Sequence, residues 1–225
     1  MTAAQVRGTL PQIIRNDEGL YEGSLSYYFC VLFNHAKNLE LPYHNFRHMA
    51  HVMWLCYAAC RFYRGTLSAR QMRNLLVAAM FHDFNHSGRL GNDALNIERA
   101  IGALRTHAAE EDRASLDEIA TLIRATEYPF VVPEDKLDLC GQILRDADVS
   151  QALSVAWIQQ VVFGLASEGG KRPIDVLHMQ EPFLKGLAFR TQWARQQFPQ
   201  SDVDAKIEEA RELICILQTE AAKAA

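Results

Sequence analysis

An adjacent histidine and aspartate, His82 and Asp83, follow directly on the apolar run Val-Ala-Ala-Met-Phe at residues 77–81. Such a run is typical of a helix that buries its face in a core. A carboxylate placed there costs several kcal/mol unless a cation or a hydrogen-bonding partner offsets the cost. A divalent metal ion is a suitable partner, because it binds imidazole and carboxylate together. The pair therefore predicts a fold that encloses a metal site between helices.

Apolar residues recur at helical spacing along the whole chain, and prolines and glycines separate the segments. The only β-like fragment, 128–132, lies between prolines and is short. We expect an all-α fold, a single compact multi-helix bundle over residues 1–225 with a buried metal site. The predicted helices lie near residues 22–38, 46–64, 69–84, 93–109, 115–127, 134–148, 152–167, 174–197 and 203–222.

Composition excludes several classes of protein. The 225 residues are 49% hydrophobic, which is enough for one domain with a substantial core. The net charge is −4 and no basic block occurs, so no nucleic-acid partner is expected. No apolar run reaches the length of a membrane span, and Met1–Ile14 lacks the apolar core of a signal peptide. We expect a cytoplasmic protein with no membrane partner, and a homodimer is left open.

The segment Tyr43-His44-Asn45-Phe46-Arg47-His48 holds a first group of candidate ligands. Asn45 can cap a helix that begins after it. His48 and His51 then lie on one side of that helix, and His48 can point inward at a metal. His44 precedes the cap, so it sits at the mouth of the helix, near solvent or substrate. His51 has no evident partner and is interpreted as a hydrogen-bonded, partly buried imidazole.

A second group is the segment His82-Asp83-Phe84-Asn85-His86. His82 and His86 are spaced to share one helix face, and Asp83 is adjacent to that face. Three metal-directed groups within so short a segment are a strong local indication of a metal site.

A third group, Arg145-Asp146-Ala147-Asp148, closes a predicted helix. Asp148 lies one turn after the apolar Leu144 and continues its inward face, whereas Asp146 does not. We therefore expect Asp148 to be a ligand, and Asp146 to face solvent or to pair with Arg145.

In this order, the segments resemble the HD-domain metal-dependent phosphohydrolases, and within them a shortened form of the class I 3′,5′-cyclic nucleotide phosphodiesterase catalytic domain. The motifs span residues 43–184. The similar segments are Tyr43-His44-Asn45-x-x-His48 (Tyr-His-Asn-x-x-His), 82–88 (His-Asp-x-Asp-His-x-Gly), Ala125-Thr126-Glu127 (Ala-Thr-Asp), 147–150 (Ala-Asp-Leu-Ser) and Gln180-x-x-Phe183-Leu184 (Gln-x-x-Phe-Ile).

The resemblance implies two divalent metal ions. His48, His82, Asp83 and Asp148 would hold the tighter ion, zinc or iron. Asp83 would also bridge to a second, more weakly held ion, magnesium or manganese, which is otherwise ligated by water.

The resemblance also implies catalytic roles close to the metals. His44 would act as the general acid that protonates the leaving oxygen, and His86 would steady the nucleophilic water. Glu98 would support His44, and Asn85 and Glu127 would support the site from outside the ligands.

Tyr43, Gln180 and Phe183 would line the substrate pocket, with Gln180 hydrogen-bonding a base and Phe183 stacking on it. The chain departs from the family pattern at Asn85 and His51, where the family has aspartates. Asn85 removes a charge beside the second metal.

The expected activity is hydrolysis of a small phosphodiester, above all of a 3′,5′-cyclic nucleotide to the 5′-monophosphate, by a metal-activated hydroxide. A small-molecule nucleotide or phosphodiester is then the partner. One alternative is an HD-type nucleotide phosphohydrolase, either a 5′-nucleotidase or a nucleotide polyphosphate hydrolase. An alkoxide leaving group needs a proton more than a phosphate does, so the His44 acid favours the phosphodiesterase.

Two further alternatives are a di-iron HD oxygenase and a non-catalytic metal-binding module. Only His86 and His107 lie between the His-Asp pair and Asp148, which leaves a second iron short of ligands. A module that only binds metal has no need of an acid such as His44.

Overall fold

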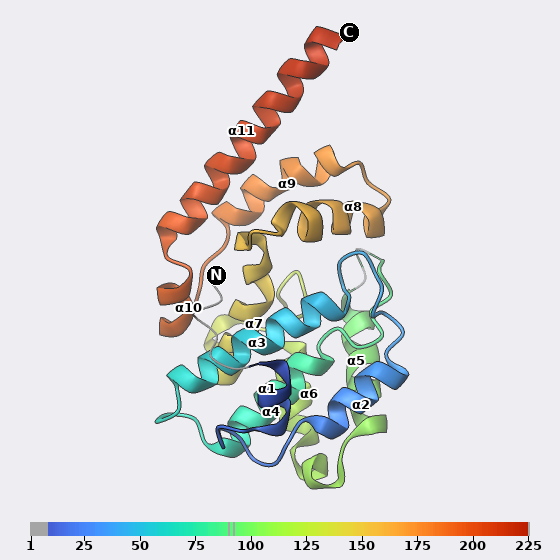
Figure 1. Cartoon of the computed structure of the whole chain (residues 1–225), viewed down its shortest axis with the longest axis vertical. Coiled ribbons are helices and arrows are strands. Elements are labelled where there is room, and N and C mark those ends of the chain that lie inside the picture. The colour runs from blue at the N-terminus through green and yellow to red at the C-terminus, as the bar shows by residue number, and fades with distance from the viewer. Residues whose placement is uncertain (1–8, 90, 92, 225) are drawn as a thin grey trace.

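The structure is a computed structural model that describes residues 9–89, 91 and 93–224. Residues 1–8 lie outside that range. They belong to Met1–Ile14, the segment that is not expected to be a signal peptide. The described residues form helices and no strand, so the all-α prediction is confirmed (Figure 1). The elements are α1 (Leu10–Arg15), α2 (Ser26–His35), α3 (Phe46–Phe62), α4 (Ala69–Phe81), α5 (Asp93–His107), the 3₁₀-helix η1 (Glu110–Ser115), α6 (Leu116–Arg124), the 3₁₀-helix η2 (Glu134–Lys136), α7 (Leu139–Val149), the 3₁₀-helix η3 (Ser150–Leu153), the π-helix η4 (Ile158–Phe163), α8 (Gly164–Gly169), α9 (Pro173–Lys185), α10 (Gln192–Gln197) and α11 (Gln200–Ala224).

The central layer is built from α3, α4, α6 and α7. Of these, α4 packs against the other three, and α7 packs against α3 and α6. Met53, Leu76, Ile123 and Ile143 belong to its apolar core and are fully or almost fully buried. Burying each such side chain contributes about 1.5–3 kcal/mol relative to leaving it exposed. This core fixes the relative positions of the ends of α3, α4 and α7. Polar side chains lie at all three ends, so the core also fixes where these side chains lie.

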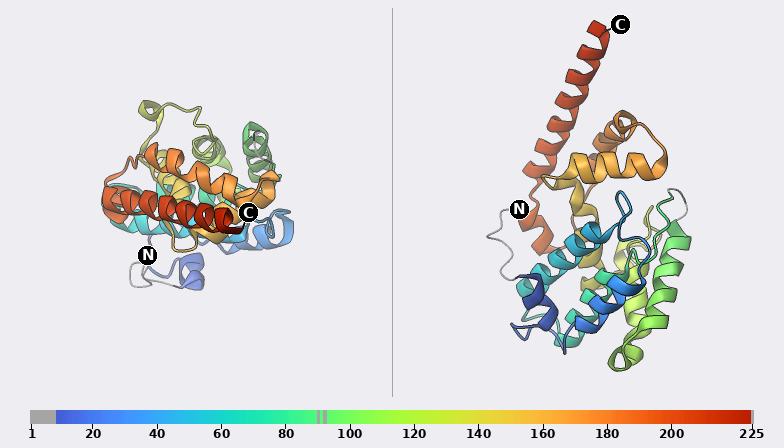
Figure 2. Two further views of the ribbon diagram at one scale, coloured as in Figure 1. Left: turned by 90° about the horizontal axis from the view of Figure 1, so that it is seen from above. Right: turned by 45° about the vertical axis from the view of Figure 1, so that its right-hand side comes forward.

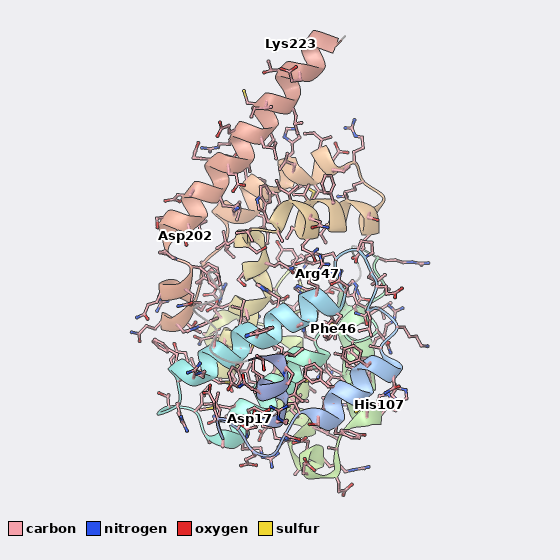
Figure 3. All side chains as sticks on the ribbon, in the orientation of Figure 1. Asp17, Phe46, Arg47, His107, Asp202 and Lys223 are labelled. Atoms are coloured by element: carbon pink, nitrogen blue, oxygen red, sulfur yellow. The ribbon has the colours of Figure 1, made fainter. Side chains whose placement is uncertain are left out.

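Local capping decides where α3 begins. The Asn45 side chain accepts hydrogen bonds from the backbone N–H groups of Arg47 (2.8 Å) and His48 (3.1 Å). Phe46 and Arg47 mark this N-terminal end of α3 in Figure 3. The cap fixes His48 in the first turn of the helix, one residue after the exposed Arg47.

A second layer, formed by η4, α8, α9 and α11, covers the loop that precedes α3 (Figures 1 and 2). Tyr43 packs against its apolar cluster, which includes Trp157 and Val161. Gly164 makes the close approach possible, because a Cβ atom there would lie 2.8 Å from the Pro42 carbonyl oxygen. Figure 2 shows α11 running along α9 and extending past the rest of the molecule.

The predicted helix 134–148 is divided at Leu137, which is extended, into η2 and α7. Two further predicted helices are broken in the structure. The predicted helix 174–197 is divided into α9 and α10, because the helix stops at Gly186 and Thr191 caps a new one through a bond to the Ala194 N–H. The predicted helix 152–167 is interrupted as well, and its middle forms the π-helix η4. Neither break is visible in hydrophobic periodicity, which continues across both.

The α4 helix ends at Phe81, earlier than the predicted 84. Asn85 adopts a left-handed conformation with φ of +62°, so the chain turns before Gly88. His86 therefore lies beyond the helix, and the prediction that His82 and His86 share a helix face is wrong.

Within the described residues, no single helix combines the length and apolarity needed to cross a membrane. Leu139–Leu153 and Ile158–Gly169, bent by 99° at the break between them, meet that test only as a pair.

Candidate active site

Three helix ends bring His48, His82 and Asp148 together. His48 lies in the first turn of α3, His82 caps the C-terminus of α4, and Asp148 lies in the last turn of α7. The His48 Nε2 atom is 3.0 Å from Asp148 Oδ1 and 3.3 Å from His82 Nε2. One nitrogen or oxygen atom from each residue lies within 4.8 Å of the others, which is a spacing that could hold a metal ion. We call these three residues together with Asp83 the His-Asp cluster.

Asp83 completes the cluster from the turn that follows α4. Its Oδ2 atom lies 3.3 Å from the Nε2 atoms of both His48 and His82 and has no hydrogen-bond partner among the described residues. By contrast, the buried carboxylate of Asp112 accepts hydrogen bonds from Arg73, Arg70 and Tyr28. A buried carboxylate oxygen without a donor is costly unless a cation binds it. Two imidazoles and two carboxylates are a donor set that suits a divalent metal.

The charges of the cluster are strongly coupled. Burial opposes the charged form of His48, but the neighbouring carboxylates of Asp148 and Asp83 outweigh it and raise the His48 pKa to about 9. Burial would raise the pKa of Asp148, but bonds with His48 and His82 lower that pKa to about 2. The pKa of His82 is raised by the same carboxylates, against burial. A cation entering the cluster must therefore displace protons from the imidazoles.

The second ring nitrogen of each cluster histidine is held by a carbonyl oxygen. His48 Nδ1 lies 2.5 Å from Gln151 Oε1, and His82 Nδ1 lies 2.9 Å from the Ala79 carbonyl oxygen. Since these oxygens accept, both Nδ1 atoms donate, and both Nε2 atoms are directed at the cluster. Such bonds orient metal-binding histidines and raise their basicity. Gln151 was not identified from the sequence, because nothing in its pattern distinguishes it from other polar residues after α7.

His44 sits outside the cluster and is held by a carboxylate. Its Nδ1 atom donates to Glu168 Oε2 over 2.6 Å, and Glu168 Oε1 also accepts the backbone N–H groups of Tyr43 (2.7 Å) and His44 (2.9 Å). Burial acts against ionisation of Glu168, but its bonds to His44 and Tyr43 lower its pKa. The His44 ring centroid is 6.1 Å from that of His48. His44 is thus fixed beside the cluster, and no described residue makes a hydrogen bond to its Nε2 atom.

The prediction that Glu98 supports His44 is wrong. Glu98 is an exposed residue of α5, and its carboxylate accepts a hydrogen bond from Arg124 over 2.9 Å. Glu168, on α8, makes the contact instead. It is 124 positions from His44 in the chain, and no sequence motif marks it.

His86 stacks on His44, with ring centroids 3.5 Å apart and the planes inclined by 23°. The Gly88 N–H donates to His86 Nδ1 over 3.0 Å, and the Asn96 side-chain amide lies 2.7 Å from His86 Nε2. Burial, together with the neighbouring His44, lowers the pKa of His86 to about 4. His86 is therefore a buried neutral imidazole, held rigidly against His44. Asn96 is a further site residue that the sequence did not single out.

Three other residues considered in the sequence, Asn85, Glu127 and His51, lie outside the His-Asp cluster. The Asn85 amide oxygen accepts the Lys37 N–H over 2.9 Å, which ties the turn to the loop after α2. Glu127 is half-buried in the turn after α6 and is not part of the His-Asp cluster. His51 is partly buried without a partner for its Nε2 atom among the described residues, and burial lowers its pKa to about 4. The expectation of a hydrogen-bonded His51 is therefore wrong for that nitrogen.

Asp146 neither faces solvent nor pairs with Arg145, so that prediction is also wrong. It is fully buried, and its carboxylate accepts the backbone N–H groups of Arg190 (3.0 and 3.1 Å) and Thr191 (2.8 Å). Asp146 therefore anchors the segment between α9 and α10 to α7.

We expect Asp146→Ala to lower the free energy of unfolding by roughly 2–4 kcal/mol, because two buried N–H groups lose their acceptor. Metal content should stay unchanged. Urea unfolding and metal analysis of the purified variant measure both quantities, with Asp148→Ala as the matched comparison. Loss of metal in Asp146→Ala at unchanged stability would exchange the roles assigned to the two aspartates.

The predicted substrate residues lie on two elements. The Tyr43 ring is half-buried, with its centroid 4.9 Å from that of His48 and 4.7 Å from that of His44. On α9, Gln180 is buried, its Nε2 donates to the Val176 carbonyl, and its Oε1 has no partner among the described residues. The Phe183 ring contacts the exposed Tyr128 with centroids 6.3 Å apart. Tyr43 thus touches the site directly, whereas Gln180 and Phe183 stand on a neighbouring helix.

Comparison with known proteins bears on the same segment. Residues 43–107 match the family model of the 3′,5′-cyclic nucleotide phosphodiesterases. The matched segment includes His44, His48, His82, Asp83 and His86, while Asp148 and Gln180 lie outside it. No curated protein matches the chain. The resemblance to the 3′,5′-cyclic nucleotide phosphodiesterases is thereby confirmed over residues 43–107, where this chain is similar to that family.

Proposed function

We propose that this protein hydrolyses a 3′,5′-cyclic nucleotide to the 5′-monophosphate with the help of divalent metal ions. The observation that carries the proposal is the placement of His44 beside the His-Asp cluster, within the segment that matches the phosphodiesterase family. A metal site alone would serve many hydrolases. An imidazole outside the metal ligands, oriented by a buried carboxylate, supplies the proton that an alkoxide leaving group requires.

His48, His82, Asp83 and Asp148 would hold the tighter ion, zinc or iron, and Asp83 would also contact a second, magnesium or manganese. When bound, two such ions activate water near neutral pH and neutralise the phosphate oxygens. Gln151 and the Ala79 carbonyl keep the two histidines in the tautomer that leaves Nε2 for a cation. The unpartnered Oδ2 of Asp83 supports this assignment.

His44 acts as the general acid. Glu168 fixes the Nδ1–H of His44, so Nε2 is the atom that gives its proton to the leaving 3′ oxygen. The carboxylate of Glu168 also stabilises the imidazolium before transfer, as a carboxylate does for histidine in other catalytic pairs. His86, which stacks on His44 and has a pKa of about 4, stays neutral and so does not repel that imidazolium.

The substrate is positioned by aromatic and amide groups around the cluster. Tyr43 lies against both His44 and His48 and would border the bound phosphate. Gln180 has a buried amide oxygen that can accept an N–H from a base, and Phe183 would stack on that base with Tyr128 beside it. Glu127 would support the site from the turn that precedes Tyr128.

The deciding experiment is hydrolysis of a panel of substrates by the full chain with Mn²⁺, Mg²⁺ or Zn²⁺ added. The panel contains cAMP, cGMP, 2′,3′-cyclic nucleotides, a linear diester and mononucleotides. We expect a 3′,5′-cyclic nucleotide to be the best substrate and chelation to abolish the reaction. Preferred release of phosphate from mononucleotides would favour the 5′-nucleotidase alternative and overturn the proposal.

A further inference from the structure

A further carboxylate, Asp93, faces the active site from the first residue of α5. Its Oδ1 atom is 3.9 Å from His86 Nε2, and its side chain is 27% exposed. Its Oδ2 atom accepts the backbone N–H of Tyr128 over 2.6 Å. One oxygen is thus bound to the loop that carries Tyr128, while the other points toward the imidazole that stacks on His44.

Asp93 lies in the electric field of the His-Asp cluster. Burial raises the pKa of Asp93 against the opposing effect of the Tyr128 N–H hydrogen bond, and the negative charges of Asp83 and Asp148 add to the rise. Like charges gathered in this way repel one another unless a cation lies among them. A cation on the side of the cluster that faces α5 would offset this repulsion.

The other polar groups near the cluster are already engaged. Both oxygens of Glu168 are occupied by His44 and by backbone N–H groups. The Asn85 amide carries no charge, and its oxygen is taken by the Lys37 N–H. Asp93 Oδ1 makes no hydrogen bond to the described residues. Among the described carboxylates around the cluster, Asp93 is therefore the one with an oxygen to spare beyond Asp83 and Asp148.

A hard cation such as Mg²⁺ or Mn²⁺ is usually held by one or two carboxylates together with water. Asp83 supplies the first carboxylate at the second metal position of the proposed function. We propose that Asp93 supplies the second negative charge at this weaker cation, and this inference rests on the two-metal site of the proposed function.

The test measures metal binding without substrate. The metal-free full chain is loaded with one equivalent of Zn²⁺, and Mn²⁺ is then titrated by electron paramagnetic resonance, in which free Mn²⁺ is observed. We expect the wild-type chain to bind one Mn²⁺. Asp93→Asn should weaken that binding by at least about 10–100-fold, because loss of even an outer partner of a metal costs that much. Asparagine keeps an oxygen for the Tyr128 N–H, so the loop contact can persist.

Two further variants make the result decisive. Glu98→Gln removes an exposed carboxylate of the same helix and should leave Mn²⁺ affinity unchanged. Asp93→Glu keeps the charge and should retain Mn²⁺ affinity within a few-fold, with circular dichroism confirming the fold of each variant. Unchanged affinity in Asp93→Asn, equal losses in Asp93→Asn and Asp93→Glu, or no second cation in the wild-type chain would each overturn the inference.

The proposed function is judged separately, by the substrate panel. Hydrolysis of a cyclic nucleotide by a chain whose Mn²⁺ binding ignores Asp93 would leave the function standing and remove the inference. Weakened Mn²⁺ binding in Asp93→Asn, in a chain that hydrolyses no cyclic nucleotide, would leave the role of Asp93 standing and remove the proposed function.

Discussion

His82→Ala is expected to abolish both tight metal binding and hydrolysis. His82 is almost fully buried, and its Nε2 atom lies 3.3 Å from Asp83 Oδ2 and from His48 Nε2. Its removal takes away one ligand and leaves the carboxylates of Asp83 and Asp148 with a single imidazole between them. Leaving buried charge uncompensated is strongly unfavourable. The loss should exceed the roughly 10–100-fold that removal of an outer partner costs in metal affinity or activity.

Metal analysis after purification, and a hydrolysis assay with metal added back, measure the two effects. His178→Ala is the matched control, because His178 is an exposed histidine on α9 and should keep full metal content. A His82→Ala chain that still carries one tightly bound metal per molecule would show that the His-Asp cluster is not the metal site.

His44→Ala is expected to keep its metal and to lose on the order of 10²–10⁴ in kcat, the usual contribution of acid–base catalysis. The imidazole lies outside the cluster, so no ligand is removed. The loss should shrink for a p-nitrophenyl phosphodiester, since p-nitrophenolate leaves without a proton. Glu168→Gln should show the same dependence on the leaving group, because Glu168 orients the Nδ1–H of His44.

The leaving-group comparison separates an acid from a structural residue. If His44→Ala slowed both substrates equally with metal content intact, His44 would act by positioning the site and not by proton transfer. Loss of metal in this variant would instead place His44 among the ligands.

Much of the fold was predictable because helical periodicity and capping are local. Asn45 caps α3 and Ser68 caps α4 as their side chains favour. The predicted starts at residues 46 and 69 agree with the structure for this reason. The ends were less predictable. Asn85 adopts a left-handed conformation, so the chain turns and His86 does not join the predicted helix face. An apolar pattern carries no signal for such a turn.

Part of the candidate active site was predictable for a similar reason. His48, His82, Asp83 and Asp148 carry metal-directed groups in an apolar context, and the structure brings the four together. The partners that orient them were not predictable. Gln151, Asn96 and Glu168 are common polar residues whose roles depend only on which helix they face.

Asp146 and Asp148 illustrate most clearly what the sequence determined and what the tertiary structure decided. The sequence alone determined that this chain folds as helices, and that a buried His-Asp pair requires a compensating partner. It also favoured Asp148, because Asp148 continues an inward face. Only the tertiary structure decided that Asp146 is buried too. Its carboxylate accepts the backbone N–H groups of Arg190 and Thr191, which lie more than forty residues further along the chain. Periodicity reports which side of a helix is covered, whereas the identity of the covering segment follows from long-range packing.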